Sequence, residues 1–575
     1  MNILIVRGGP AGLAAGLILK RRHPAWSVTI GPAGNLAALP AQVLTNPVLP
    51  TLHLGEPGLR AAILAVAHQS AGIAVVRGVA GETPEVCFIP GLAYSTAGLE
   101  AIVGAILPLA QAAGCVFAAE TVQAECDGYD LVLVCDAEDP DDAGLDTGAF
   151  DVRSDDSGRV CCNLALSAVE IDVPQFSCLR TSAGLITATG FVERSGQMSM
   201  ILEADKSTVQ ALGLAGALPE TLAGFVSQLA GGKTSGASII VRQGWQVADV
   251  RSAAARRSGK VIIFGAAVAG IHHSIGLQTR HDLEEAQSLA IAIADAGVPG
   301  PRLDAALEQW EGACIKRTAS YQRAAAASAQ WLAEADRYCA LPMEQFAFAC
   351  ATRSHRMGYK RVRDAAPDFA DRLDRLAAGL QSGAGNSPPP PMFTPYGLRD
   401  LELPNRLVFS PMCMYSATDG TVNDFHTVHL GARATGGFGL VIAEMTNVTA
   451  QGRMTLGCAG MYAPAHVPAW RRVTAYVHTH TQSRIGIQLA HAGRKGSIGR
   501  SWEKYEPIRD ESLWEVLAPS PIPFTPDRPL PREMTLADIQ ETIDAFARAA
   551  RMSVDAGFDM IELHMAHGYL ISEFI

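Results

Sequence analysis

The chain has 575 residues, of which 48% are apolar and 18% charged, a balance typical of globular proteins with more than one sizeable domain. Its formal net charge is −11 and it has no long basic run, so we expect no nucleic acid partner and no anionic membrane surface. The 12 cysteines form no C-x-x-C pair and the apolar runs are too short to span a bilayer, so we expect a cytoplasmic protein.

The first segment of the chain has the pattern of a dinucleotide-binding unit. A predicted strand, Ile3 to Val6, leads into the turn R-G-G-P-A-G at Arg7 to Gly12, and a helix and a second strand, Ser27 to Ile30, follow. Gly9 and Gly12 occupy the second and third glycine positions of the G-x-G-x-x-G fingerprint, which bring the backbone close to a pyrophosphate and the helix close to the strand. Arg7 replaces the first glycine, so a purely structural turn remains the alternative.

Later parts of the chain divide at a linker, Gln381 to Pro391, which reads Q-S-G-A-G-N-S-P-P-P-P. Before it, residues 303–380 are rich in Ala, Arg and Glu with helical spacing. The predicted strands are 130–135 and 260–264 before the linker and 407–410, 440–444, 485–489 and 560–563 after it, and the clearest helices after it are 467–481 and 536–556. This alternation predicts parallel β/α units in the second half.

The order of motifs before the linker resembles the FAD-dependent aromatic hydroxylases. After the glycine turn, that family has an Asp-Gly motif and later a Gly-Asp motif, and this chain has Asp136-Ala137 and Gly265-Ala266 at those places. The segment His273 to Ala286 resembles the start of the helix that follows in the family. Residues 303–379 look most like salicylyl-CoA 5-hydroxylases, in which the hydroxylase is fused to a second flavoprotein. The resemblance implies a Rossmann-like fold and FAD as cofactor, with Gly9, Gly12 and Gly265 as its contacts.

Several of the residues that hold FAD in this family are missing here. Arg7 stands in place of a glycine, Gly31-Pro32 in place of the acid expected after the second strand, and Ala137 and Ala266 in place of the other two motif residues. A flavin hydroxylase must hold FAD tightly and away from water. The sequence therefore favours a folded relic with weak or no FAD binding, and a working hydroxylase on an aromatic acyl-CoA thioester is the alternative.

After the linker, the chain resembles the bacterial ene-reductase branch of the old yellow enzyme family. The stretches F-T-P-Y-G-L-R-D-L-E-L-P-N-R-L-V-F-S-P-M-C-M-Y-S, G-L-V-I-A-E-M-T and G-I-Q-L-A-H-A-G-R-K occur in the family's order. The resemblance implies FMN as cofactor and NADH or NADPH as reductant, with Cys413 tuning the flavin and Tyr415 lining the substrate pocket. The implied flavin contacts are Ser410, Pro411, Met412, Cys413, Met445 and Gln488, each expected at the end of a strand.

The segment M-I-E-L-H-M-A-H-G-Y-L, at residues 560–570, carries the predicted catalytic groups. The apolar run Met560 to Leu563 predicts a short buried strand that leads into His564, His567 and Tyr569. By the resemblance, the two imidazoles donate hydrogen bonds to a substrate carbonyl and Tyr569 supplies a proton. The H-x-x-H spacing also suits a metal, but no third ligand is evident, so we predict no metal there.

Together these patterns predict an α/β protein with a Rossmann-like hydroxylase domain at 1–300, a helical extension at 301–380, the linker at 381–391 and an incomplete (β/α)8 TIM barrel of about four β/α units at 392–575. Because a full barrel needs about 250 residues, we expect a C-terminally truncated chain. The predicted function is a flavin-dependent oxidoreductase acting on a small molecule, either an enone or an acyl-CoA thioester. A chain without catalysis that only binds a partner remains the alternative, and the oligomeric state is left open.

Overall fold

The computed structural model describes residues 1–575 except 37–38, 120–126, 136–149, 217, 235–236, 381–387, 504–505 and 509–511, and of 154–157 and 248–250 it describes the backbone alone. The chain divides into two compact units, Met1–Leu373 and Asp374–Ile575. The predicted boundary at the linker lies a few residues further along, and most of the linker falls outside the described residues, as does the predicted motif Asp136-Ala137. Each unit is described by itself below.

The N-terminal unit begins with a sheet that is mostly parallel. Its strand order is β13-β14-β7-β1-β2-β6, and all neighbours are parallel except β13 and β14. The strands are β1 (Asn2–Ile5), β2 (Ser27–Ile30), β6 (Val116–Phe117), β7 (Leu131–Val134), β13 (Arg257–Ser258) and β14 (Val261–Ile263). The four strands predicted from the sequence in this part of the chain are confirmed, because short apolar runs between turns identify buried parallel strands.

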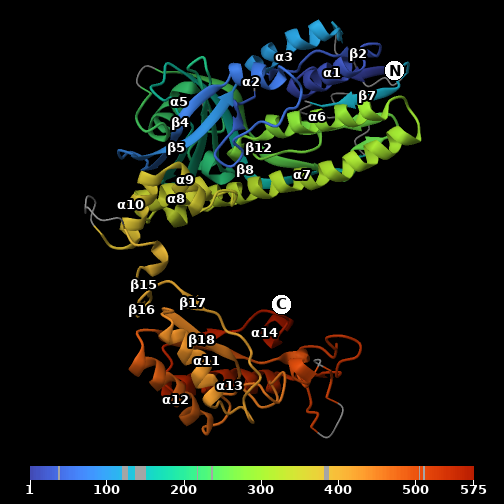
Figure 1. Ribbon diagram of the computed structural model, residues 1–575. Coiled ribbons are helices and arrows are strands. Elements are labelled where there is room, and N and C mark those ends of the chain that lie inside the picture. Colours follow the sequence, from blue (N-terminus) through green and yellow to red (C-terminus); the bar gives the residue numbers. More distant parts are fainter. Residues whose placement is uncertain are drawn as a thin grey trace. The chain divides into compact units, whose positions relative to one another are not determined.

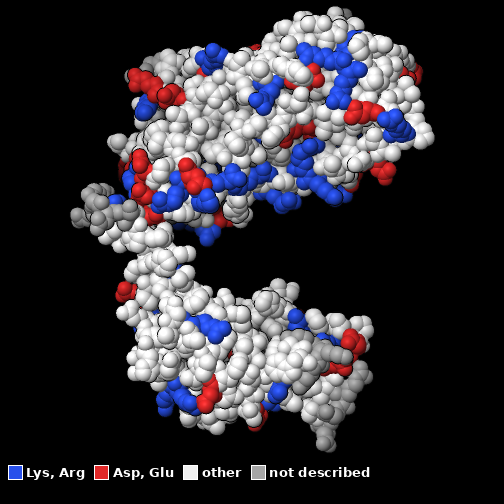
Figure 2. Space-filling view, viewed as in Figure 1, with Lys and Arg blue, Asp and Glu red and all other residues white. Residues whose placement is uncertain are grey.

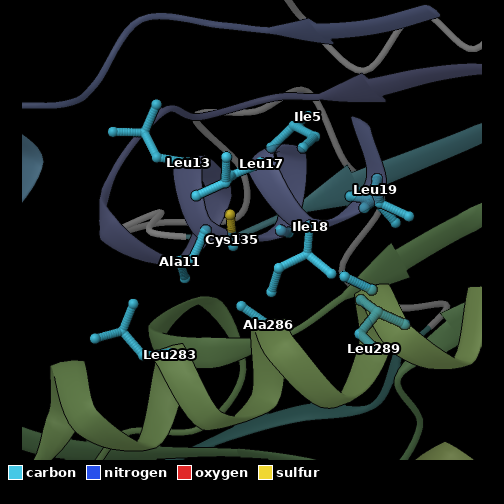
Figure 3. Close-up of a cluster of buried hydrophobic side chains, with 14 of the residues drawn as sticks. Ile5, Ala11, Leu13, Leu17, Ile18, Leu19, Cys135, Leu283, Ala286 and Leu289 are labelled. Carbon is cyan, nitrogen blue, oxygen red and sulfur yellow. The ribbon is translucent and has the colours of Figure 1, made fainter. Parts of the chain in front are cut away.

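Helix α1 (Pro10–Arg22) follows β1 and belongs to one of this unit's clusters of buried apolar side chains. Gly9 is its N-cap residue, and Pro10 fits the first helical position. Three basic residues lie in its last turn, where their positive charge interacts favourably with the negative end of the helix dipole. Ala11 and Ile18 of α1 face α6 (Gln278–Ala296), which contributes Leu283 and Leu289 to the same cluster of buried apolar side chains, whereas Leu13 and Leu17 point away from α6 (Figure 3). Helices α2 (Leu59–Ala65) and α3 (Leu99–Ala113) contribute side chains to the same cluster.

A second sheet of eight strands was not predicted from the sequence. Its order is β12-β8-β11-β10-β9-β4-β5-β3, and only β4 and β9 are parallel neighbours. The strands are β3 (Gln42–Thr45), β4 (His68–Val79), β5 (Glu85–Ala97), β8 (Val152–Ser167), β9 (Gln175–Thr181), β10 (Gly184–Val192), β11 (Met198–Asp205) and β12 (Ser238–Ala253). Buried polar residues such as Asn163, Thr187 and Glu203 interrupt the apolar pattern of these strands and conceal them in the sequence.

Helices complete the N-terminal unit. Short helices α4 (Lys206–Ala211) and α5 (Pro219–Leu229) accompany the large sheet, and the long helix α7 (Pro301–Ala333) packs against α6. Helices α8 (Met343–Thr352), α9 (Tyr359–Ala365) and α10 (Pro367–Ala377) follow, as the helical spacing of residues 303–380 predicted (Figure 1). Figure 2 shows basic side chains gathered along the edge of this unit that α7 to α9 form, with acidic side chains among them. In the described part of the chain, no helix is long and apolar enough to cross a bilayer.

The C-terminal unit is built on four parallel strands in the order β17-β18-β19-β22, so the predicted strands are consecutive neighbours. They are β17 (Val408–Phe409), β18 (Leu440–Asn447), β19 (Arg484–Ala490) and β22 (Met560–Leu563). Two small two-stranded sheets accompany them, one of β15 (Tyr396–Leu398) and β16 (Leu401–Leu403) and the other of β20 (Leu517–Ala518) and β21 (Arg532–Glu533). Helices α11 (Asp424–Thr435), α12 (His466–His480), α13 (Leu536–Asp555) and α14 (Leu570–Glu573) alternate with the strands (Figure 1). The arrangement is an α/β fold consistent with part of a TIM-barrel-like domain.

The helices of this unit begin at clear capping signals. Asn423 and His426 form a reciprocal capping box at α11, and Thr535 and Asp538 form another at α13. One face of the sheet packs its apolar side chains against α11, α12 and α13, where Trp470 is fully buried. The opposite face is therefore the one available for a site.

Two strand predictions need correction. The run Met560 to Leu563 is a strand, but it is not buried, and Leu563 is 48% exposed. Among the described strands β22 pairs only with β19, so it is an edge strand and its side chains are half exposed. Strand β18 also runs three residues past its predicted end at Glu444, because its pairing with β19 continues beyond a bulge as far as Asn447.

Candidate functional site

A bulge in β18 determines which side chains face the candidate site. Ala443 pairs with Ile487 and Met445 pairs with Gln488, so Glu444 is an extra residue in β18. Val441 and Ala443 point toward the helices. Because one inserted residue reverses the alternation of a strand, Met445 points to the opposite face, together with Gln488. Met445 was expected at the end of the strand and instead lies within it.

Cys413 and Tyr415 pack on that same face. Their cluster contains Tyr415, Met445, Met454, Cys458, Ala490, Ala492, Ile498 and Tyr569, with Cys413 against it. Burial, with smaller effects of Cys458 and Glu444, raises the pKa of the Cys413 thiol to about 12, so the sulfur is a neutral thiol at neutral pH. The structure therefore brings together residues from four predicted motifs that are far apart in the sequence.

Ser410, Pro411 and Met412 lie just after β17 and outside this cluster. Ser410 is exposed, Pro411 is half-buried and Met412 is 50% exposed. Gln488 is buried, and its amide Nε2 donates a hydrogen bond of 2.8 Å to Glu562 Oε1 on β22. Of the six predicted flavin contacts, Cys413, Met445 and Gln488 are thus on the buried side and the other three lie toward the surface.

Glu444 is a site residue that the sequence analysis missed. It is 4% exposed, and its Oε2 accepts the backbone N–H of Met414 at 2.7 Å. Its Oε1 lies 3.6 Å from Nε2 of His426, which is also buried. The bulge that turns Met445 also aims this carboxylate at the loop of Cys413, and so it fixes the loop. An acid inside an otherwise apolar strand was the available signal.

His564, His567 and Tyr569 form one contact group after β22. Their ring centroids are 4.9 Å apart for the two imidazoles and 4.7 Å apart for His564 and Tyr569, and His567 Nδ1 lies 3.1 Å from His564 Nε2. The backbone N–H of His564 donates to Leu489 at the end of β19. Burial lowers the pKa of His564, and the nearby His567 lowers it further, so His564 is a neutral ring at neutral pH.

The backbone at this group is unusual. His567 has φ +59° and Gly568 has φ +67°, two consecutive residues in the left-handed region. A histidine in that region is uncommon, and such outliers concentrate at functional sites. The turn brings Tyr569 back to the cluster of Cys413, where its side chain is 9% exposed and its hydroxyl lies 3.7 Å from Sδ of Met454.

Lys495 is a second residue that the sequence analysis missed. It donates a hydrogen bond to the carbonyl of His567, and its Nζ lies 5.4 Å from the ring centroid of Tyr569 and 4.4 Å from that of Phe524. Burial lowers its pKa. Its position in the motif G-I-Q-L-A-H-A-G-R-K was visible, but the contact with the segment after β22 was not.

The predicted glycines of the N-terminal unit lie at close contacts. Gly9 caps α1, and a Cβ on Gly12 would come within 2.1 Å of the backbone oxygen of Arg7. Gly265 has φ +65°, so it needs the conformational freedom of glycine. Its N–H donates to Oε2 of Glu285 at 2.8 Å. The backbone N–H of Gly265, a predicted FAD contact, is therefore already hydrogen-bonded to a buried carboxylate.

Glu285 belongs to a buried ionic network behind that turn. It is fully buried, and Oε1 lies 3.0 Å from Nε2 of His281 and accepts from Thr318 at 2.8 Å. Nη1 of Arg256, which is 1% exposed, lies 3.6 Å from Oε2. Burial opposes ionisation of Glu285, but His281 and Arg256 outweigh it and hold the pKa below its usual range.

This network predicts a pH dependence of stability. Burial by itself would lower the pKa of His281, but Glu285 and Asp282 raise it from 6.5 to about 9. Because the folded state holds this proton more tightly than the unfolded chain, its contribution to stability is complete below pH 6.5 and is lost as the pH rises through 9. We expect the N-terminal unit to lose stability over this window in urea denaturation. His281→Gln should make the free energy of unfolding depend less on pH, whereas the exposed control His53→Gln should leave the pH dependence unchanged. Equal pH dependence in the two variants would contradict the role given to His281.

Comparisons with known proteins concern the C-terminal unit. Residues 391–575 match the family model of the NADH:flavin oxidoreductase / NADH oxidase family. NADPH dehydrogenases of a Geobacillus species and of Geobacillus thermodenitrificans are each 46% identical over 186 residues, which is 32% of this chain and 50% of theirs. Morphinone reductase, a solved structure, is 26% identical with a TM-score of 0.28, covering 31% of this chain and 49% of its own. The chain spans about half the length of the curated relatives it matches, and its C-terminal unit is similar to old yellow enzyme-like flavin oxidoreductases.

Proposed function

We propose that residues 391–575 form the flavin-binding and substrate-binding part of an NAD(P)H-dependent oxidoreductase that reduces an alkene conjugated to a carbonyl. The observation that supports it most is the convergence of Cys413, Tyr415, Met445 and Tyr569 in one buried cluster, with His564 in ring contact with Tyr569. The similarity of this unit to NADPH dehydrogenases supports the same reaction class. We propose the same reaction as the activity of the whole protein.

The residues on this face fit the ring of FMN. The carboxamide of Gln488 offers both a donor and an acceptor, as the pyrimidine edge of a flavin requires. Cys413 and Met445 supply apolar, polarisable sulfur beside it. When bound, FMN supplies hydride-transfer chemistry, with NADH or NADPH as the source of electrons. Phosphate sites of such barrels come from the loops of strands seven and eight, and the described parallel sheet has four strands, so we expect weak FMN binding by this chain.

The chain's own residues would act on the substrate carbonyl. Neutral His564 carries its ring proton on Nε2, because Nδ1 accepts the backbone N–H of Ala566 at 3.2 Å, and this Nε2 lies 3.1 Å from Nδ1 of His567. A substrate carbonyl oxygen would take the place of the contact between the rings and accept hydrogen bonds from them where negative charge develops. Lys495 contacts the carbonyl of His567 and the ring of Tyr569, so it holds this group in position and adds positive charge nearby. The Tyr569 hydroxyl would hold the proton that is delivered to the carbon next to the carbonyl.

Flavin titration of the 575-residue chain tests the cofactor assignment. We expect Gln488→Leu to weaken FMN binding up to about tenfold, the worth of one or two hydrogen bonds. The control Gln540→Leu changes an exposed glutamine on α13 and should leave the affinity unchanged. Fluorescence quenching of FMN measures both. No FMN binding at all, or equal affinity in both variants, would favour a chain that binds a partner without catalysis.

A narrower proposal concerns the N-terminal unit. We infer descent from a Rossmann-like, FAD-dependent aromatic hydroxylase of the salicylyl-CoA type, with a cofactor site that binds FAD poorly. The donation of the Gly265 N–H to Glu285 supports it, since that donor is not free for a ligand. The same titration with FAD distinguishes the cases. Stoichiometric FAD in the unmodified chain would contradict the proposal, and Arg7→Gly with Ala266→Asp should raise occupancy.

A further inference from the structure

Three possible metal ligands meet in the N-terminal unit, and none of them is among the predicted flavin contacts. Glu203 lies near the end of β11, and His272 and His273 lie at the short helical turn His273–Ile275. One ligand atom of each residue lies within 4.8 Å of the other two, and within the described ranges they form the one such group of three or more. Glu203 and His272 are buried, and the His273 side chain is 17% exposed.

Both imidazoles approach the same carboxylate oxygen. Oε2 of Glu203 lies 2.8 Å from Nε2 of His273 and 3.5 Å from Nε2 of His272. This oxygen is buried, yet no donor is aligned with it. Ligands on a tetrahedral zinc ion at 2.0–2.1 Å are separated by about 3.3 Å, so the two distances bracket the value that a shared cation would impose.

The surroundings hold the carboxylate in a fixed orientation. Arg159 is buried, and its Nε donates to Oε1 of Glu203 at 2.5 Å while its Nη1 donates to Asp205 at 2.9 Å. Oε1 is thereby occupied and Oε2 is the oxygen left to face the imidazoles. Such hydrogen bonds to a ligating carboxylate are typical of metal sites. Asp205 also offsets the positive charge of Arg159, which would otherwise oppose a cation.

We propose that Glu203, His272 and His273 bind a divalent cation of the zinc class, with water completing the coordination. Two imidazole nitrogens and one carboxylate oxygen suit this class of ion. Binding has a cost, because His272 Nδ1 accepts the N–H of Ser274 at 3.3 Å and so the free ring carries its proton on Nε2. For Nε2 to bind the cation, the ring proton must move to Nδ1 and the N–H of Ser274 must give up its contact with Nδ1, so that the bound imidazole stays neutral. The cation ties strand β11 to the turn at His273, and therefore stabilises the N-terminal unit.

The test uses the tag-free 575-residue chain, with Co²⁺ absorption and Zn²⁺ titration calorimetry as readouts. We expect one equivalent of metal, a blue or pink Co²⁺ band displaced by Zn²⁺, and an unfolding temperature that rises with Zn²⁺ concentration. His273→Gln should lower the affinity at least tenfold and remove the band. His53→Gln, an exposed histidine in the same unit, should change neither.

Two further variants keep the result interpretable. Glu203→Gln removes the charged ligand but is buried, so far-UV circular dichroism must show it folded, and His273→Gln carries the conclusion if it is not. His567→Ala disrupts the pair His564 and His567 in the C-terminal unit, which is another possible place for a metal ion. Binding that survives His273→Gln but disappears in His567→Ala, or no binding by the unmodified chain, would overturn the proposal.

Discussion

Replacing Tyr569 by phenylalanine is expected to lower the rate of NADPH-dependent reduction of a cyclic enone by about 10²–10⁴-fold, the usual contribution of a positioned general acid. The change removes only the hydroxyl, which lies 3.7 Å from Met454 Sδ. The ring contacts with His564 and with Lys495 remain. Flavin affinity and stability should therefore stay close to their original values.

This experiment suits a chimera in which residues 391–575 replace the matching half of the Geobacillus NADPH dehydrogenase, since that half covers 50% of the relative. The chimera should bind FMN more tightly than the 575-residue chain, because it carries all the strands of the relative. Tyr476→Phe, on the exposed part of α12, is the matched control. A Tyr569→Phe chimera that keeps the full rate would remove Tyr569 from the proposed chemistry.

The second large effect is expected from Glu285→Gln in the N-terminal unit. The amide keeps the shape of the side chain but removes the charge between the buried Arg256 and His281, and His281 keeps only its contact with Asp282. Removing one partner of a buried ionic group typically costs about 3–5 kcal/mol, because the remaining charges stay desolvated. Gly265 also loses a charged acceptor for its N–H.

Native-state hydrogen exchange of the α6 amides measures this loss within the two-unit chain, where a single unfolding transition is not assured. Glu308→Gln on α7 is a suitable control, since Glu308 is exposed. A loss of less than about 1 kcal/mol would mean that the network reorganises around the amide and that its charges are less tightly coupled than the distances indicate.

The sequence predicted those parts of the fold that local patterns determine. β2 and β22 have the predicted bounds, and the four strands of the C-terminal unit are consecutive parallel neighbours, because apolar runs alternate with helical ones. The eight-stranded sheet was missed, since its pairings join distant segments such as β4 and β9 and its strands bury polar residues such as Glu203.

The candidate site was predicted by its motifs but not by its contacts. Cys413, Tyr415, Met445 and Tyr569 do meet in one cluster. Glu444 and Lys495 were not foreseen, because the role of Glu444 depends on a bulge and that of Lys495 on a contact with the turn after β22. Neither feature leaves a periodic signal in the sequence. The exposure of β22 was missed for the same reason, since an apolar run does not say how many neighbours a strand has.

The bulge at Glu444 also separates two kinds of evolutionary change in β18. Substitutions at Val441 and Ala443 alter the packing against the helices, whereas substitutions at Met445 alter only the face that holds the candidate site. The size of the side chain at position 445 can thus vary without a penalty in the helix-facing core. A deletion of one residue from β18 has no such freedom, because it would rotate Met445 into the helices and withdraw the carboxylate from the loop of Cys413. Under the proposed function, libraries that vary side chains at 445 and keep the length of β18 would be the direct route to altered substrate selectivity.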